Sequence, residues 1–107
     1  MPEILRSRPA RGDAGLDIAA WANIQDEQVV ERVLCGETAL YEILMRRHNQ
    51  RLYRVGVSIL RNDTEAEDVM QEAYVRAYAH LRQFAGEAKF ATWLTKIAVH
   101  EALAACV

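Results

Sequence analysis

The acidic and basic side chains of this sequence are segregated in two adjacent blocks. Residues 46–61 contain five arginines and no acid, whereas residues 63–72 contain five acids and no base. Acids at a helix start are either solvated groups that the helix dipole favours or part of a docking surface for a basic partner. Helical spacing of i, i+3, i+4 and i+7 would place four side chains of this region on one face, which suits a basic partner helix. These four are Asp68, Gln71, Glu72 and Val75.

A short loop between two phenylalanines is the second candidate site. Phe84 and Phe90 flank it, Gly86 lies inside it and Lys89 precedes its end. Aromatic side chains that flank a short loop either pack into the core or stack on unpaired bases of any identity. Gly86 would allow close approach of a backbone, and Lys89 could meet a phosphate. The hydroxyl of Thr92 and the charge of Lys96 would continue this surface along the next helix.

Enzymatic and metal-binding patterns are not found. His100 and Glu101 begin like a zinc-binding H-E-x-x-H motif, but Ala104 stands where the second histidine is needed. The sequence has no phosphate-binding loop and no nucleophile motif of the hydrolases. Cys35 and Cys106 fit neither a C-x-x-C motif nor a disulfide framework, so we expect reduced thiols in a cytoplasmic protein. We therefore expect no catalytic residue, no metal and no cofactor.

The composition limits which folds and functions the sequence can have. The 107 residues are 51% hydrophobic, and only 2 are proline and 5 glycine, which favours helices around a modest core. No apolar run is long enough to span a membrane, and we expect no secretory signal. The formal charge of −2 means that any nucleic-acid binding must come from local patches.

Apolar residues at helical spacing predict four helices. They run from about 26 to 35, 37 to 61, 64 to 83, and from 89 or 92 to the end. Asp26 is the expected N-cap of the first helix, Gly36 its stop, and Thr64 with Glu67 the capping box of the third. Gly56, inside the second helix, predicts a close helix crossing. No segment alternates with a period of two, so we expect an all-α fold, a compact bundle of about four helices.

Two stretches of the last two helices resemble a known family. Residues 68–78, DVMQEAYVRAY, resemble the D-x-x-Q-E-x-F-x-x-x-[WY] helix of bacterial sigma factors. Residues 84–98, FAGEAKFATWLTKIA, resemble the F-x-G-x-x-x-F-x-T-W-L-x-x-I-A stretch of the extracytoplasmic-function (ECF) group. The upstream segments GETALYEIL and RLYR are also similar to that group, so the resemblance covers about residues 26–103. It implies a sigma factor region 2 domain at residues 25–107. We expect a tail at residues 1–24, in which a short helix can form.

The resemblance also implies partners. The face of Asp68, Gln71, Glu72 and Val75 would dock on the clamp helices of the largest subunit of core RNA polymerase. The loop between Phe84 and Phe90 would hold the melted non-template strand of the promoter −10 element. The helix from Thr92 onward would read that region, with Thr92, Lys96 and His100 as its DNA-binding residues. Trp93 and Leu94 continue the apolar stripe, which favours a place in the core.

Two departures from the family pattern favour an alternative. Family members usually carry Asn near the position of His100, and a basic run after Leu103, where this sequence reads AACV. The second domain, a helix-turn-helix that reads the −35 element, is also expected to be absent. The alternative is an interaction module that binds polymerase or an anti-sigma factor without contacting DNA. Lys89, Thr92 and Lys96 beside the loop favour the DNA-binding interpretation, because a pure docking module does not need them.

Overall fold

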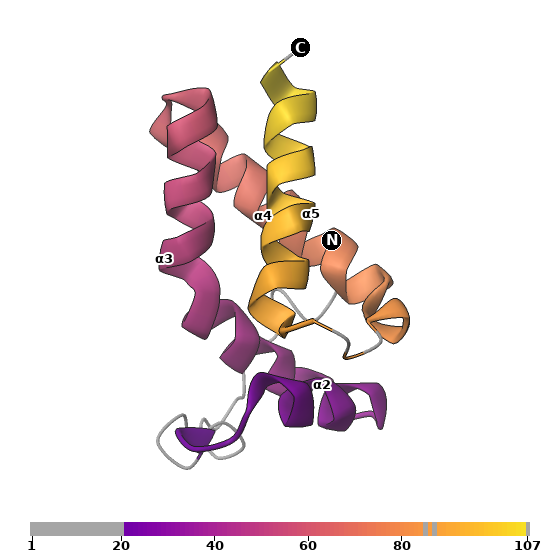
Figure 1. Ribbon diagram of the computed structural model, residues 1–107. Coiled ribbons are helices and arrows are strands. Elements are labelled where there is room, and N and C mark those ends of the chain that lie inside the picture. The colour runs from indigo at the N-terminus through magenta and orange to yellow at the C-terminus, as the bar shows by residue number, and fades with distance from the viewer. Residues whose placement is uncertain (1–20, 85, 87, 107) are drawn as a thin grey trace. The chain divides into compact units, whose positions relative to one another are not determined.

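Helices account for the regular structure of the chain wherever it is described. The computed structural model describes residues 21–84, 86 and 88–106, and these residues contain no strand (Figure 1). The all-α prediction is confirmed, with four α-helices in this part of the chain. Most of the expected tail, residues 1–20, lies outside the described residues. The elements are α2 (Asp26–Leu34), η2 (Thr38–Leu40), α3 (Tyr41–Leu60), α4 (Asp63–Ala79), η3 (Leu81–Gln83) and α5 (Phe90–Cys106).

The chain divides into two compact units, residues 1–47 and residues 48–107. In the first, α2 packs against η2, and an apolar row on α2 is buried. The buried side chains of this unit are Val29, Val30, Val33, Leu40, Tyr41, Ile43 and Leu44.

The ends of α2 are set by local backbone chemistry. Gln25, rather than the expected Asp26, precedes the helix as its N-cap, and its backbone N–H donates to the Gln28 side chain at 3.1 Å. Asp26 is instead the first residue of the helix, and its carboxylate accepts a hydrogen bond from Arg47 at 2.9 Å. Gly36 follows the helix with a φ of +114°, a backbone conformation that glycine adopts without strain. The predicted stop at Gly36 is confirmed.

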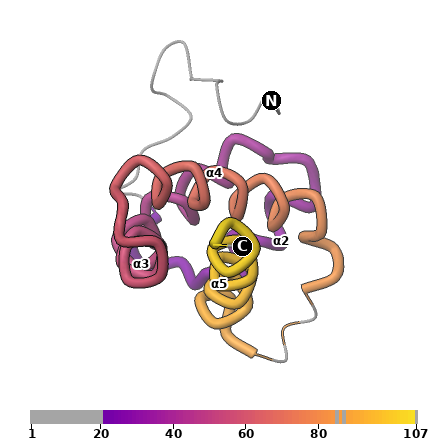
Figure 2. Tube along the Cα trace, turned by 90° about the horizontal axis from the view of Figure 1, so that it is seen from above, coloured from indigo at the N-terminus to yellow at the C-terminus, as the bar shows by residue number. Residues whose placement is uncertain are grey.

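In the second unit, α4 and α5 pack against each other along rows of small and apolar residues (Figures 1 and 2). Every fourth residue of α5 from Phe90 to Ala102 is buried, and alanines dominate the matching row of α4. Small side chains allow the two backbones to approach closely. The buried apolar residues of this unit are Leu52, Ala66, Val69, Ala73, Tyr74, Ala77, Leu81, Phe90, Leu94, Ala98 and Ala102.

The predicted close crossing at Gly56 is confirmed. A Cβ atom added to Gly56 would lie 2.9 Å from Cβ of Ala66 on α4, closer than real Cβ contacts. Any side chain at position 56 would therefore push the end of α3 away from the start of α4.

The predicted bounds of the third helix need two corrections. Asn62 is its N-cap, and the Asn62 side chain accepts a hydrogen bond from the backbone N–H of Glu65 at 2.9 Å, so the predicted capping box of Thr64 and Glu67 is wrong. The α-helix ends at Ala79, and residues 81–83 form the separate 3₁₀ turn η3. Asparagine is among the best N-caps, and the helix begins at the first such residue that the chain offers.

Within the described ranges, no helix is both long and apolar enough to cross a membrane. Over the same ranges, no three His, Cys, Asp or Glu side chains gather where they could hold a metal ion. Cys35 and Cys106 are free thiols and both are exposed.

Candidate functional site

The outer face of α4 carries the four residues predicted to dock on a partner. Asp68, Gln71 and Glu72 are exposed and Val75 is half-buried. They lie opposite the buried row of the same helix, because successive residues turn by about 100°. The side chains of Asp68 and Gln71 have no hydrogen bond or ion pair with any residue that the structure describes. Their polar atoms are therefore available to a partner.

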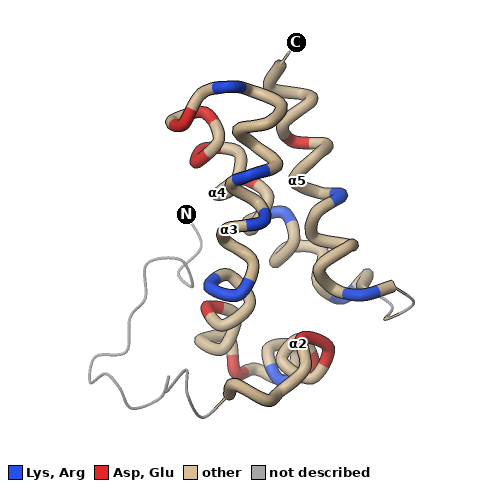
Figure 3. Tube along the Cα trace, turned by 60° about the vertical axis from the view of Figure 1, so that its left-hand side comes forward, with Lys and Arg blue, Asp and Glu red and all other residues tan. Residues whose placement is uncertain are grey.

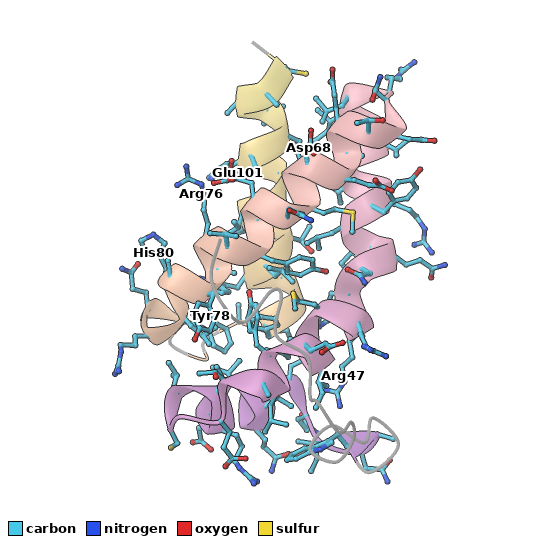
Figure 4. The ribbon with its side chains drawn as sticks, turned by 180° about the vertical axis from the view of Figure 1, so that it is seen from behind. Arg47, Asp68, Arg76, Tyr78, His80 and Glu101 are labelled. Carbon is cyan, nitrogen blue, oxygen red and sulfur yellow. The ribbon has the colours of Figure 1, made fainter. Side chains whose placement is uncertain are left out.

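Glu72 forms an ion pair with Arg76 of the same helix. The Arg76 Nε atom lies 3.6 Å from a carboxylate oxygen of Glu72, one turn earlier on α4. The same guanidinium forms an ion pair with Glu101 on α5, and Figure 4 shows these two side chains pointing toward each other. The side chain of Glu101 is only 19% exposed, against 54% for Arg76. Arg76 thus connects the candidate docking face to α5, a connection that the sequence did not indicate.

A shallow hollow of about 460 Å³ adjoins this face and widens the acidic surface. Two alanines near the end of α5 and Val69 give it an apolar part, while four carboxylates surround them. Its lining residues are Glu65, Asp68, Val69, Glu72, Glu101, Ala104 and Ala105. The negative surface is therefore shared between α4 and α5, which spacing along one helix could not reveal.

The aromatic side chains around the predicted DNA-binding loop form a cluster with one another. The ring of Phe90 is 1% exposed, and its centroid lies 5.6 Å from that of Phe84 and 5.7 Å from that of Trp93. His48 also packs on Phe90, at 5.7 Å between ring centroids. The ring of Phe90 is thus a core element that a base cannot reach in this conformation. Phe84 and Trp93 remain half-buried.

Gly86 is the turning point of that loop. Its φ of +78° lies in the left-handed region, and a Cβ atom there would meet no neighbour within 4 Å. The glycine is therefore required by the backbone conformation rather than by crowding. Lys89 is exposed at the end of the loop, immediately before α5.

Three predicted DNA-binding residues come together with Arg51 in a groove between α3 and α5. Thr92, Lys96 and His100 follow one another at i, i+4 and i+8 on α5, and all three are exposed. The groove has a volume of about 560 Å³. We call it the α3–α5 groove; its lining residues are Arg51, Thr92, Thr95, Lys96, Val99 and His100. Phe84, Gly86, Lys89 and Phe90 do not line it.

The cations of this groove have no acidic partner among the residues that the structure describes. Within the described part of the chain, neither Arg51 nor Lys96 has an ion pair, and no acid lines the groove. By contrast, Arg46 pairs with Glu42 and Arg47 pairs with Asp26. Figure 3 shows basic positions on both α3 and α5, and acidic positions at the start of α4. The second unit therefore offers an acidic surface on α4 and a basic groove between α3 and α5.

Comparison with known proteins supports the resemblance to sigma factors. Residues 44–106 match the family model of sigma-70 region 2. The chain is 37% identical over 78 residues to the RNA polymerase sigma-H factor of Pseudomonas aeruginosa, which covers 73% of this chain and 40% of the relative. It is 35% identical over 80 residues to the ECF RNA polymerase sigma-E factor of Haemophilus influenzae and over 79 residues to that of Escherichia coli, covering 74% of this chain and 41% of each relative.

The chain thus spans about two fifths of the length of these curated relatives. The matched region contains both the outer face of α4 and the α3–α5 groove. The motifs of residues 68–78 and 84–98, the all-helical fold and the matched region agree, and the chain belongs to the sigma-70 region 2 family, as an ECF-type sigma factor region 2 domain.

Proposed function

We propose that this domain acts in transcription initiation by docking on core RNA polymerase through α4 and contacting the melted non-template strand of the promoter −10 element. The clamp helices of the largest polymerase subunit are the proposed partner of α4. The α3–α5 groove, together with Phe84, Gly86 and Lys89 of the loop, is the proposed DNA-binding surface. The observation that carries the proposal is the pair Asp68 and Gln71, exposed at the centre of one helix face with no partner among the described residues.

Electrostatics supports the assignment of a protein partner to α4 and of DNA to the α3–α5 groove. Exposed carboxylates on α4 would repel the phosphates of DNA but attract a basic helix. Unpaired cations in the α3–α5 groove have the opposite preference, since phosphate contacts dominate the affinity of proteins for nucleic acids. A chain with net charge −2 can bind DNA through a local surface that is basic, and no acid among the described residues lines the groove.

Reversal of one charge on α4 tests the docking half of the proposal. We expect Asp68→Arg to weaken capture of core RNA polymerase by the immobilised domain by about tenfold or more, because a like charge would face a basic partner. Glu67→Arg is the matched control, since it changes the charge equally at a neighbouring position turned by about 100°. Equal capture by Asp68→Arg and by the unchanged domain would refute docking through this face.

An interaction module that binds polymerase or an anti-sigma factor without DNA is the alternative. The burial of Phe90 favours it, because one of the two rings expected to stack on bases is occupied in the core. The two functions differ in one measurable property, which is binding of single-stranded DNA by the domain at low salt. Measurable binding supports the DNA-contacting function, and its absence supports the alternative.

The proposal also assigns a compartment and a mode of regulation. Core RNA polymerase acts in the bacterial cytoplasm, so this domain would act there, by binding rather than by catalysis. An anti-sigma factor would inhibit it by covering the outer face of α4 or the α3–α5 groove. Competition between such a factor and core polymerase for the domain would test this point.

A further inference from the structure

We infer that copies of this chain associate head to tail, with a basic row on α3 of one copy packed against an acidic row on α4 of the next. The basic row is Arg51 and Arg54, and the acidic row is Glu65 and Asp68. Both rows belong to the same compact unit, residues 48–107. The inference goes beyond the proposed function, because the partner is a second copy of the chain rather than polymerase or DNA.

The two rows have the same spacing. Arg51 and Arg54 lie at i and i+3 on α3, and Glu65 and Asp68 lie at i and i+3 on α4. Residues three apart on a helix are separated by about 4.5 Å along the axis and by about 60° around it. Two helices that pack side by side can therefore place both cations opposite both carboxylates at once, whichever way the helices run.

The charges of both rows lack a partner among the described residues. All four side chains are exposed, and none of them has an ion pair or a side-chain hydrogen bond with a described residue. Other charged side chains of the same helices are paired, since Arg46 contacts Glu42 and Arg76 contacts Glu72. The charge that is left over is thus positive on α3 and negative on α4, and pairing between copies would satisfy both.

Within one copy the two rows do not meet. α3 and α4 approach each other at Gly56 and Ala66, where an added Cβ atom would lie only 2.9 Å from its neighbour. Each member of a row is turned by about 100° or more around its helix from that contact. Figure 3 shows the basic positions along α3 and the acidic positions at the start of α4. The rows are therefore placed to contact another copy.

The hollow beside the acidic row gives an arginine stem a place to lie. Val69, Ala104 and Ala105 form the apolar part of this hollow of about 460 Å³. The methylene groups of arginine pack along apolar surface while the guanidinium stays at a polar edge. An arginine of a second copy would lay its stem on the two alanines. Its guanidinium would then lie between Glu65 and Asp68, whose carboxylates match its planar array of donors.

The association is expected to be transient and open-ended. A stable interface buries about 800 Å² on each partner, whereas one face of the 17-residue helix α4 is only about 25 Å long and about 10 Å wide. Exposed ion pairs are also individually weak and screened by salt. Each copy can bind one neighbour through α3 and another through α4, and such a contact does not close into a symmetric dimer.

Sedimentation velocity of the 107-residue chain tests the association, at chain concentrations up to about 1 mM. At about 0.01 M salt, where the Debye length is about 30 Å, we expect the sedimentation coefficient to rise with concentration and not to level off at a dimer. At about 1 M salt, where the Debye length is about 3 Å, we expect only the monomer. A chain that stays monomeric at low salt, or that levels off at a dimer, would overturn the head-to-tail contact.

Charge reversal identifies the two rows. We expect Arg54→Glu and Asp68→Arg each to weaken the association about tenfold or more, because each brings like charges together. Arg82→Glu and Glu67→Arg are the matched controls, since they make the same reversals at exposed positions outside the rows. The controls should leave the association within about twofold of that of the unchanged chain. Controls that weaken it as strongly as the row variants would show that net charge, and not these rows, governs the association.

A mixture of the two row variants gives the decisive result. The Arg54→Glu variant keeps an intact acidic row, and the Asp68→Arg variant keeps an intact basic row. An equimolar mixture should therefore associate at concentrations at which neither variant associates alone. A mixture that stays monomeric would overturn the pairing of α3 with α4. Circular dichroism of each variant would show that its helices are retained.

The outcome does not depend on the proposed function, because the experiment contains neither polymerase nor DNA. Failure of the domain to capture polymerase would leave the contact between copies standing, and a strictly monomeric chain would leave polymerase docking standing. One consequence does rest on the proposed function. Association covers Asp68, so it would compete with docking of polymerase on α4.

Discussion

Gly56 on α3 and Ala66 on α4 lie so close together that a methyl group on Gly56 would come within 2.9 Å of the Ala66 side chain. Both residues are buried, so neither helix has room to yield. We expect Gly56→Ala to lower the free energy of unfolding by about 1–3 kcal/mol, the usual cost of overpacking. This occurs although alanine is the better helix former by about 1 kcal/mol. Urea denaturation followed by circular dichroism would measure it.

A compensating change separates crowding from other effects at this crossing. Ala66→Gly alone should cost about 1 kcal/mol through helix propensity. The double variant Gly56→Ala, Ala66→Gly should be more stable than the sum of the two single effects predicts, because the second change removes the atom that the first one meets. Additive effects would contradict a close contact between these two residues.

Arg61 is the described non-glycine residue with a positive φ, at +58°, and it directly follows α3. Its backbone N–H still donates to the carbonyl of Val57 at 2.8 Å, so it terminates the helix in the left-handed conformation. Glycine adopts this conformation without the steric penalty of a Cβ atom. We expect Arg61→Gly to raise the free energy of unfolding by about 0.5–1 kcal/mol, measured by urea denaturation. Arg61→Ala keeps the Cβ atom and should give no such gain.

The helices were largely predictable from the sequence because their apolar spacing is a local property. Gly56 also predicted the helix crossing correctly, because a glycine inside a long helix needs a reason to be there. The first turn of α4 was harder, since Asn62, Asp63 and Thr64 are all acceptable caps. The choice of Asn62 depends on the direction in which the chain leaves Arg61, and that direction is a three-dimensional feature.

The candidate site was also only partly predictable from the sequence. The face containing Asp68 and Gln71 was predictable, because four residues of one helix share a face whatever surrounds them. Arg51 was not singled out, because five arginines lie between residues 46 and 61, and only packing against α5 shows which of them lines the groove. The burial of Phe90 likewise depends on where α5 meets His48 of α3 and Phe84 of the loop.

Tyr74 makes the stability of the domain depend on alkaline pH. Burial raises the pKa of its hydroxyl above the ordinary value of about 10, and the hydroxyl donates to Asn49 at 2.8 Å. The unfolded chain therefore releases this proton at lower pH than the folded chain does. Stability from this group is complete below pH 10 and falls above it, by up to about 1.4 kcal/mol per pH unit.

The variant Tyr74→Phe tests this pH dependence. At neutral pH it should be less stable by about 1 kcal/mol, because the hydrogen bond to Asn49 is lost. Between pH 10 and pH 11, its free energy of unfolding should fall less steeply than that of the unchanged chain. Urea titrations at each pH would give both slopes, and equal slopes would show that Tyr74 ionises alike in the folded and unfolded states.

Phe90 should matter for stability and not for DNA affinity. With its ring 1% exposed, Phe90→Ala should cost about 3–5 kcal/mol of unfolding free energy, and the variant is a poor subject for binding studies. Phe90→Leu keeps most of the apolar volume and should cost less than about 1.5 kcal/mol.

The leucine variant separates a structural ring from a base-contacting one. We expect it to bind a fluorescein-labelled strand of ten thymidines within about twofold of the unchanged chain, as measured by fluorescence anisotropy. Loss of a stacked ring would cost about 1–3 kcal/mol of binding free energy, and this ring is covered. Phe84→Leu is the matched comparison, since Phe84 is half-buried at the other end of the same loop and keeps part of its ring accessible. A loss of affinity confined to Phe84→Leu would assign base stacking to Phe84 alone. A loss of more than about fivefold in Phe90→Leu would instead mean that the loop opens on DNA and exposes the ring that the free domain buries.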